Sequence, residues 1–381
     1  MWPCGGFPMS PDAPRQQVRI LGDGCAALSL AARAGDLAGH EIHLVRPKGA
    51  PAESDHIWGF WGTPLLAEAS RLARAKWHRW SIVSEAGQVV MQSATRPYTA
   101  LHRRVWTDHC RAKASGAGVT VTDEAANAGS LTDQAGLVFD SRPASVPGGM
   151  MLQHFLGLEI RSNRAVFDPQ TAILMDFRVD QSRGMHFIYL LPFSATEALV
   201  ESTLFTPSVC PEVFYLDSIA TYLHAQFGLT DFATIRTERG VIPLGTLPRR
   251  DPSISGIGGN GGAIRPSSGY AFPFIQKQID RAIATANAGG PLRFEVPHQR
   301  IDLWMDAVLL TVLRHWPERA PDLFLRMGQA LQGDEFARFL GGEADWPLRL
   351  KVILAMPKWP FLRGLVRMLA GPRQPPVTEG A

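Results

Sequence analysis

The sequence predicts an α/β fold with a Rossmann-like domain, an antiparallel β substrate domain and a helical C-terminal region. Three observations support this fold class. A glycine-containing turn joins an apolar strand to an alanine-rich helix near the N-terminus, apolar strand-like segments fill residues 153–206, and apolar side chains recur at helical spacing beyond residue 301. At 381 residues with 45% hydrophobic content, the chain is long enough for two domains or one large one.

The first strand, turn and helix carry a nucleotide-binding pattern. An apolar strand at residues 18–21 precedes Gly22-x-Gly24-x-x-Ala27, and a helix and a second strand at residues 40–45 follow. Gly22 permits the tight turn, Gly24 leaves room for a pyrophosphate, and Ala27 lets helix and strand pack closely. The unit therefore predicts a dinucleotide site, and the alternative is a plain strand–turn–helix.

The end of the second strand departs from that pattern. An acid that holds the adenosine ribose is usual there, whereas this strand ends in Val45-Arg46-Pro47. Two interpretations stay open: Arg46 meets a phosphate, or the ribose lacks its usual partner.

Composition excludes several classes of function. The net charge is only +3 and no basic cluster is interleaved with aromatics, so we expect no nucleic-acid partner. The four cysteines are scattered without a Cys-x-x-Cys pair, which argues against a disulfide scaffold or a metal site and fits a reducing cytoplasm. Neither a secretory signal nor a membrane-spanning apolar run is recognisable.

The chain is expected to divide into five parts. They are a flexible tail at 1–17, a discontinuous nucleotide-binding domain at 18–150 and 239–297, a β-rich substrate domain at 151–238, a helical region at 298–370, and a tail at 371–381. The expected strands of the substrate domain are residues 155–160, 172–179, 185–193 and 198–206, and a helix is expected at 213–227. Residues 81–83 and 88–91 form an expected hairpin in the first domain.

A second glycine-rich loop lies at residues 257–270, directly before an expected helix at 270–288. Glycines at this density let backbone N–H groups approach a flat or anionic ligand closely. A flexible linker is the alternative interpretation.

These landmarks, in this order, resemble the bacterial lycopene cyclase family, flavoproteins that close the ends of the linear carotenoid lycopene into rings. The resemblance runs from residue 18 to residue 369. It rests on the segments Gly22-Asp-Gly24, His56-Ile-Trp58-Gly-Phe60, Phe139-Asp140-Ser-Arg142, Gln153-x-Phe155-x-Gly157, Leu174-Met-Asp176, Tyr189-Leu-Leu-Pro192, Val200-Glu201-Ser-Thr203, Gly261-Gly-Ala-Ile-Arg-Pro-Ser-Ser-Gly-Tyr270 and Ala355-Met-Pro-Lys358. Ser202 stands where the family usually has a second acid, and Asn260 where related flavoproteins often have Asp.

The resemblance implies an FAD-dependent isomerase (an intramolecular lyase) that cyclises lycopene or a related linear carotenoid to β-ionone rings with no net redox change. It implies FAD active in the reduced form, with NAD(P)H as a possible reductant. The cofactor-binding residues that it implies are Gly22, Gly24, Ala27, Asp140, Gly261, Gly262, Pro266 and Gly269.

Glu201 is the first candidate for the catalytic acid. It lies in an apolar and hydroxylic strand in which alternation puts Leu199, Glu201 and Thr203 on one face. A carboxyl group in an apolar cavity has a raised pKa and stays protonated near neutrality, which protonation of an alkene requires. The alternative is a surface acid on an edge strand.

Asp176 and His56 are the other catalytic candidates. Asp176 is also a single acid in an apolar strand, and it either shares a proton with Glu201 or makes a structural hydrogen bond. His56 is a proton relay or a loop residue bonded to backbone. The neighbouring aromatic residues Trp58, Phe60 and Trp61 face a cationic intermediate or pack in the core.

Two other functions stay open on the same architecture, because fold alone does not determine function. The first is a flavin-dependent monooxygenase or reductase acting on a polyisoprenoid. The second is a carrier that binds flavin or carotenoid without catalysis.

The last expectation concerns a membrane surface. Residues 346–373 contain six Lys or Arg side chains, no Asp or Glu, and many apolar side chains including Trp and Phe. This composition predicts peripheral association with the cytoplasmic membrane, and a core helix with a solvated basic face is the alternative.

Overall fold

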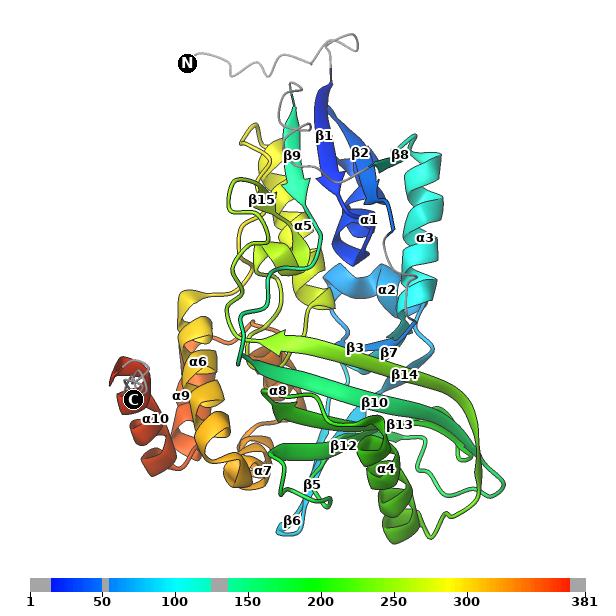
Figure 1. Cartoon of the computed structure of the whole chain (residues 1–381), viewed down its shortest axis with the longest axis vertical. Coiled ribbons are helices and arrows are strands. Elements are labelled where there is room, and N and C mark those ends of the chain that lie inside the picture. The colour runs from blue at the N-terminus through cyan, green and yellow to red at the C-terminus, as the bar shows by residue number, and fades with distance from the viewer. Residues whose placement is uncertain (1–14, 50–54, 125–135, 371–381) are drawn as a thin grey trace, which may run out of the picture.

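In the computed structural model, residues 15–49, 55–124 and 136–370 are described, and they form a parallel sheet and a larger mixed sheet with a small sheet between them (Figure 1). The expected tail at 371–381 and most of the one at 1–17 lie outside the described residues. The first strand already begins at Gln16, inside the expected N-terminal tail.

The parallel sheet has the strand order β15-β9-β1-β2-β8. Its strands are β1 (Gln16–Leu21), β2 (His40–Pro47), β8 (Thr120–Glu124), β9 (Leu137–Asp140) and β15 (Ser255–Gly256). The helices around it are α1 (Cys25–Ala31), α3 (Arg103–Gly116) and α5 (Phe272–Asn287), with the short α2 (Ala67–Arg71) below them (Figure 1). Because β1 pairs with β2 in parallel and α1 connects them, the predicted βαβ unit is confirmed.

The larger sheet has the order β14-β10-β13-β12-β11-β5-β6. Its strands are β5 (Arg79–Ser84), β6 (Gly87–Gln92), β10 (Met151–Ser162), β11 (Thr171–Asp176), β12 (Met185–Pro192), β13 (Glu197–Thr206) and β14 (Phe232–Leu244). The hairpin of β5 and β6 forms as predicted, but β5 pairs in parallel with β11, so the hairpin extends this sheet and not the nucleotide-binding domain. The expected boundary between residues 238 and 239 falls inside β14.

The small sheet has the order β3-β7-β4 and consists of β3 (Ile57–Trp61), β4 (Ala75–Trp77) and β7 (Tyr98–His102).

The two faces of the larger sheet are covered by different helices. Along β13, Leu199 and Phe205 belong to the apolar cluster shared with the C-terminal helices, whereas Val200 and Leu204 belong to the cluster shared with α4 (Glu212–Phe227). Side chains alternate between the faces of a strand, so the predicted face of Leu199, Glu201 and Thr203 is the one toward the C-terminal helices.

The C-terminal region is helical, as the sequence predicts. It contains α6 (Arg300–His315), α7 (Ala320–Ala330), α8 (Gly333–Leu340), α9 (Trp346–Ala355) and α10 (Lys358–Ala370). α7 packs on β5 and β6, while α10 packs on α6 at the outer side of the molecule (Figure 1). None of the helices in the described parts of the chain has the length and apolar character that a bilayer crossing needs.

Candidate active site

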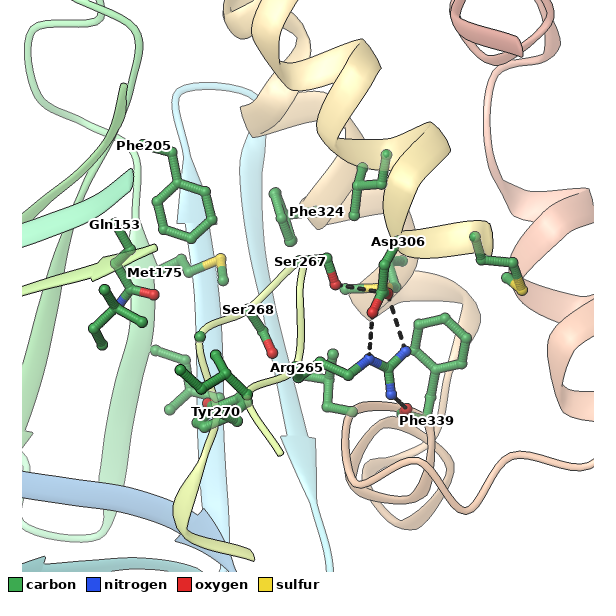
Figure 2. A pocket seen from close by; sticks show the side chains of 18 of the residues that line it. Gln153, Met175, Phe205, Arg265, Ser267, Ser268, Tyr270, Asp306, Phe324 and Phe339 are labelled. Atoms are coloured by element: carbon green, nitrogen blue, oxygen red, sulfur yellow. Dashed lines mark hydrogen bonds and ion pairs between the residues drawn. The ribbon is translucent and has the colours of Figure 1, made fainter. Parts of the chain in front are cut away.

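A large apolar cavity of about 670 Å³ lies between the larger sheet and the C-terminal helices. Strands β10 to β14 supply one wall, helices α6 to α10 supply the other, and the glycine-rich loop lies between them. Figure 2 shows Gln153, Met175 and Phe205 on the sheet side and Phe324 and Phe339 on the helix side. The cavity therefore has the volume and the apolar lining to hold a large apolar ligand.

The loop that closes the cavity is held by a buried ion pair. The Arg265 guanidinium donates to Asp306 of α6 at 2.8 and 3.1 Å, and Ser267 Oγ donates to the same carboxylate at 2.7 Å (Figure 2). Arg265 Nη1 also donates to the Phe339 carbonyl oxygen at 3.3 Å. These bonds fasten the glycine-rich loop to two C-terminal helices, and they orient Ser268 and Tyr270 toward the cavity.

Glu201 lines this cavity, and its residue is only 7% exposed. Thr203 Oγ1 donates to Glu201 Oε1 at 2.6 Å, and no Lys, Arg or His among the described residues forms an ion pair with it. Burial, and secondly the nearby Glu238 carboxyl, raise the pKa of Glu201 from 4.5 to about 8. Glu201 is therefore an acid that keeps its proton at neutral pH on the wall of an apolar cavity.

Asp176 lies apart from this cavity, on the side of the sheet covered by α4. Its carboxylate accepts from the Arg178 guanidinium at 2.9 and 2.6 Å and from the Tyr222 hydroxyl at 2.8 Å. Tyr222 belongs to α4, whereas Glu201 faces the C-terminal helices. The structure does not bring Asp176 and Glu201 together, and the contacts of Asp176 support the structural hydrogen-bond role.

His56 and Trp58 lie at the cavity wall. Trp58 Nε1 donates to His56 Nε2 at 2.9 Å, and the Trp58 ring stacks on Phe272 with centroids 5.0 Å apart. Burial and then the Arg103 charge lower the pKa of His56 to about 4, so the imidazole is neutral at physiological pH. Phe60 and Trp61 are buried in the two apolar clusters beneath the wall, where core packing occupies them.

Three tyrosine hydroxyls meet inside the cavity. Tyr98 Oη lies 2.9 Å from Tyr189 Oη and 3.3 Å from Tyr270 Oη. Gly59 makes this possible, because a Cβ there would lie 2.1 Å from Tyr98 Oη and 2.6 Å from Tyr189 Oη. The group connects the strand beside Glu201 to the glycine-rich loop, since Tyr189 is the cross-strand partner of Glu201.

The nucleotide-binding residues predicted from sequence lie around the carboxyl ends of β1 and β9. Gly22 has a φ of +105°, and Gly24 precedes α1 with no atom within 4 Å of where its Cβ would be. Ala27 is fully buried against the sheet. The open space at Gly24 is a cradle that a side chain would fill, which fits a pyrophosphate group.

The glycine-rich loop packs against the same helix. A Cβ on Gly258 would lie 2.5 Å from the Ala26 Cβ, so only a glycine allows this approach to α1. Asn260 Nδ2 donates to the Asp140 carbonyl oxygen at 3.1 Å, which links the loop to the end of β9. Gly261 and Gly262 follow directly, so the predicted residues of both segments are brought together.

Pro266 and Gly269 lie farther along the loop, toward the cavity, and Gly269 lines it. Two charged residues of the region already have protein partners. The Asp140 carboxylate accepts from the Arg142 side chain at 2.8 Å through each oxygen, and Arg46 Nε donates to Asp23 Oδ2 at 2.7 Å.

Comparison with known proteins identifies the family. The sequence model described as "Lycopene cyclase protein" matches residues 17–366. The chain belongs to the lycopene cyclase protein family. Two bacterial lycopene beta-cyclases are similar to it: one from Paracoccus sp. (strain N81106 / MBIC 01143), 29% identical over 65% of this chain and 67% of that protein, and one from Pantoea ananas, 28% identical over 56% and 58%.

Solved structures show that this lycopene cyclase family member has the fold of flavoproteins. A flavoprotein/dehydrogenase from Cytophaga hutchinsonii superposes with a TM-score of 0.59 at 12% identity, covering 93% of this chain and 99% of that one. A geranylgeranyl bacteriochlorophyll reductase-like protein from Thermoplasma acidophilum superposes with a TM-score of 0.56 at 13% identity, covering 89% and 96%. The predicted fold class and the predicted family are thus confirmed.

Sequence reasoning missed the second carboxyl near the site, Glu238 of β14, and the grouping of the three tyrosine hydroxyls. Arg236 and Glu238 stand two residues apart, which indicates one face of a strand. That signal does not reveal that β14 pairs with β10, and only this pairing places Glu238 near Glu201.

Proposed function

We propose that this lycopene cyclase family member closes the ends of lycopene or a related linear carotenoid into β-ionone rings, as an FAD-dependent isomerase with Glu201 as the acid. The observation that carries the proposal is the Glu201 carboxyl, held protonated by burial on the wall of a large apolar cavity. The similarity to bacterial lycopene beta-cyclases supports the substrate class.

In the proposed reaction, the Glu201 carboxyl donates its proton to the terminal double bond of the polyene. A neighbouring double bond attacks the resulting carbocation, and the Glu201 carboxylate left by the first step takes one proton back from the new ring. The acid is restored, and the isomerisation needs no oxidant or reductant. The apolar lining of the cavity offers little to hold water that would trap the cation, and Trp58 and Tyr189, which line it, carry aromatic rings of the kind that stabilise positive charge.

The residues fit a flavin dinucleotide. Gly22, Gly24 and Ala27 would hold the pyrophosphate at the start of α1, and Gly261 and Gly262 belong to the glycine-rich loop that packs against the same helix. Bound FAD in its reduced form would supply an electron-rich ring that stabilises positive charge, with NAD(P)H needed only to keep it reduced. At the ribose end, where the usual acid is absent from the sequence, Arg46 donates to Asp23, and both interpretations of Arg46 stay open.

The flavin site is tested with Gly24→Val, which fills the space that a pyrophosphate needs. We expect purified Gly24→Val to contain no FAD, measured by absorbance and by the flavin released on denaturation. Gly148→Val is the matched control, since Gly148 also has no atom within 4 Å of a Cβ position and lies outside the nucleotide turn. A folded, flavin-loaded Gly24→Val protein would contradict the assignment.

Cyclisation is tested by expressing the protein in a lycopene-accumulating host and analysing the pigments for ring type and mass. The proposal expects ringed products of unchanged mass, and the purified protein should form them without consuming O₂ or NAD(P)H with each product. Stoichiometric consumption would favour the monooxygenase or reductase alternative. Unchanged pigment in the presence of bound flavin would favour a carrier.

We further propose that α9 and α10 dock on the cytoplasmic membrane, where such a substrate resides. Leu354, Trp359 and Leu369 are 72%, 63% and 75% exposed, although they are large apolar side chains. Ile353 and Leu362, on the same two helices, line the cavity, so the exposed apolar surface adjoins the opening through which a polyene would enter. Lys and Arg side chains between them suit anionic head groups.

Sedimentation with anionic liposomes tests this surface. We expect the double substitution Arg363→Glu and Arg367→Glu to weaken sedimentation while flavin content is kept. The control is the same charge change at exposed Arg293 and Arg300, which lie outside α9 and α10. Equal recovery of the wild type and the Arg363/Arg367 variant in the pellet would argue against this surface.

A further inference from the structure

Glu201 has a carboxyl neighbour two strands away. Gly157 of β10 is the cross-strand partner of Glu201 on β13 and also of Glu238 on β14. Residues that are paired across a sheet project to the same face, so both glutamates extend from the face that bears the cavity. They flank one glycine, from strands roughly 10 Å apart.

Gly157 leaves the space between the two acids open. A Cβ at this position would lie 3.1 Å from Glu238 Cγ and 3.4 Å from Glu201 Cβ. The Glu238 side chain therefore leans over the glycine toward Glu201. Any other residue in the middle strand would separate the two carboxyl groups by a side chain.

The partners of the two acids differ. Glu238 Oε2 accepts from Arg236 Nη2 at 2.8 Å and from the Ile57 backbone N–H at 3.2 Å, two donors that stabilise a carboxylate. Glu238 Oε1 is buried and has no hydrogen-bond partner within the described parts of the chain. Glu201 accepts only the Thr203 hydroxyl among the hydrogen bonds of the described residues. Glu238 is thus the acid better suited to carry the negative charge.

The other charged and titratable groups around the pair lie mostly on the Glu238 side. Arg236 also reaches Glu159 of β10 at 3.4 Å and Asp55 at 3.6 Å, so its positive charge is shared among three acids. Next to Asp55, the buried imidazole of His56 is neutral. On the cavity side, burial, and secondly a neighbouring tyrosine, raise the pKa values of Tyr98 and Tyr189 well above 10, so both hydroxyls are neutral.

We propose that Glu238 is a positioning residue of the site: ionised beside Arg236, it acts across Gly157 and holds the Glu201 carboxyl in its protonated form. This inference rests on the proposed function for its catalytic meaning, but the coupling of the two carboxyl groups exists whatever the substrate. Glu238 does not line the cavity, so it acts through Glu201 and not on the polyene. Two carboxyl groups whose surroundings differ in this way divide into one acid and one anion.

The pKa values agree with this division. Burial raises the pKa of Glu238 to about 7, with Arg236 acting in the opposite direction, whereas the pKa of Glu201 rises to about 8. The directions of the secondary causes differ: Arg236 lowers the pKa of Glu238, whereas Glu238 raises the pKa of Glu201. Coupled groups of this kind titrate as a pair, so the pH dependence of the site belongs to both.

The test is the pH profile of cyclisation in Glu238→Gln, which removes the charge and keeps the shape and the acceptor atom. We expect the alkaline limb of kcat/KM to shift to lower pH by on the order of one unit, the coupling at which two groups titrate together. Glu159→Gln is the matched control, because it also removes an acid bonded to Arg236 and does not pair with Gly157 across the sheet. In Glu159→Gln, the alkaline limb of kcat/KM should stay at the pH of the wild type. An unshifted limb in Glu238→Gln, even with reduced activity, would overturn the proposal.

An infrared titration of the protonated carboxyl band tests the pair without any carotenoid. We expect a band that persists above pH 7 in the flavin-loaded wild type, is lost in Glu201→Gln, and titrates at lower pH in Glu238→Gln. If the wild type shows this pattern but makes no rings, the cyclase proposal fails and the coupling stands. If rings form but the band in Glu238→Gln titrates as in the wild type, the coupling fails and the cyclase proposal stands.

Gly157→Ala provides a second variant in case Glu238→Gln does not fold. Its methyl group would press on Glu238 Cγ and Leu199 Cδ1, each at 3.1 Å, and so move Glu238 away from Glu201. We expect the infrared band of Glu201 to titrate at lower pH, in the same direction as in Glu238→Gln. An unchanged titration in a folded Gly157→Ala protein would overturn the proposal.

Discussion

The two faces of the larger sheet give similar acidic residues different partners. Glu201 and Asp176 are each a single acid in an apolar strand, and both are buried. On the face toward α4, Asp176 has a bidentate arginine and a tyrosine hydroxyl. On the face toward the C-terminal helices, Glu201 has one hydroxyl and a neighbouring acid. Burial is common to both acids, so they differ in their partners: among the residues that the structure describes, Asp176 is paired with a cation and Glu201 is not.

The largest expected effect is a loss of ring formation when Glu201, on the cavity face, is substituted. Glu201→Gln keeps the shape of the side chain but cannot deliver a proton, so we expect ring formation to fall by about 10²- to 10⁴-fold. Flavin content and the melting temperature should stay close to those of the wild type. Turnover of lycopene by the purified variant measures the effect, and activity like that of the wild type would remove Glu201 from the mechanism.

The second prediction concerns how stability depends on pH. The pKa of Glu201 is raised from 4.5 to about 8 in the folded protein, so the folded state binds a proton that the unfolded state releases. This contribution to stability is full below about pH 4.5 and is lost as the pH rises through about 8. Between these limits the free energy of unfolding should fall by up to about 1.4 kcal/mol per pH unit more steeply in wild type than in Glu201→Gln. Parallel curves from urea unfolding at several pH values would contradict the raised pKa.

On the α4 face, the expected effect is structural. Asp176→Asn removes the negative charge between Arg178 and Tyr222, so we expect a loss of about 1–3 kcal/mol in the free energy of unfolding, discounted because Arg178 is partly exposed. Ring formation per folded molecule should be unchanged. Denaturant unfolding and turnover, measured on the same preparation, separate the two effects, and a selective loss of turnover would return Asp176 to the catalytic candidates.

The smallest expected effect concerns Ser202, which follows Glu201 and so points to the opposite face. Its hydroxyl lies 2.9 Å from His186 Nε2. Ser202→Ala removes one neutral hydrogen bond, so we expect it to lower the free energy of unfolding by about 0.5–1.5 kcal/mol and to leave the pH profile of cyclisation in place. A shifted profile would show that the residue at this position influences the acid on the other face.

Much of the fold was predictable because it depends on local patterns. The βαβ unit follows from an apolar strand, two glycines and a small residue, and the hairpin of β5 and β6 follows from alternation around a turn. The assignment of that hairpin to a sheet was not predictable. Its partner β11 lies about ninety residues later in the chain, and no local pattern encodes such a pairing.

The sequence by itself determined that an acid stands at position 201 among apolar residues and that glycines stand where a pyrophosphate would approach. Only the tertiary structure decided which partners surround each acid, because some of those partners come from distant segments. Arg178 and Tyr222 meet Asp176, whereas β10 places Gly157 between Glu201 and Glu238. Electrostatic interactions depend on the distance between charges in space, and residues far apart in the sequence can lie close together in the fold.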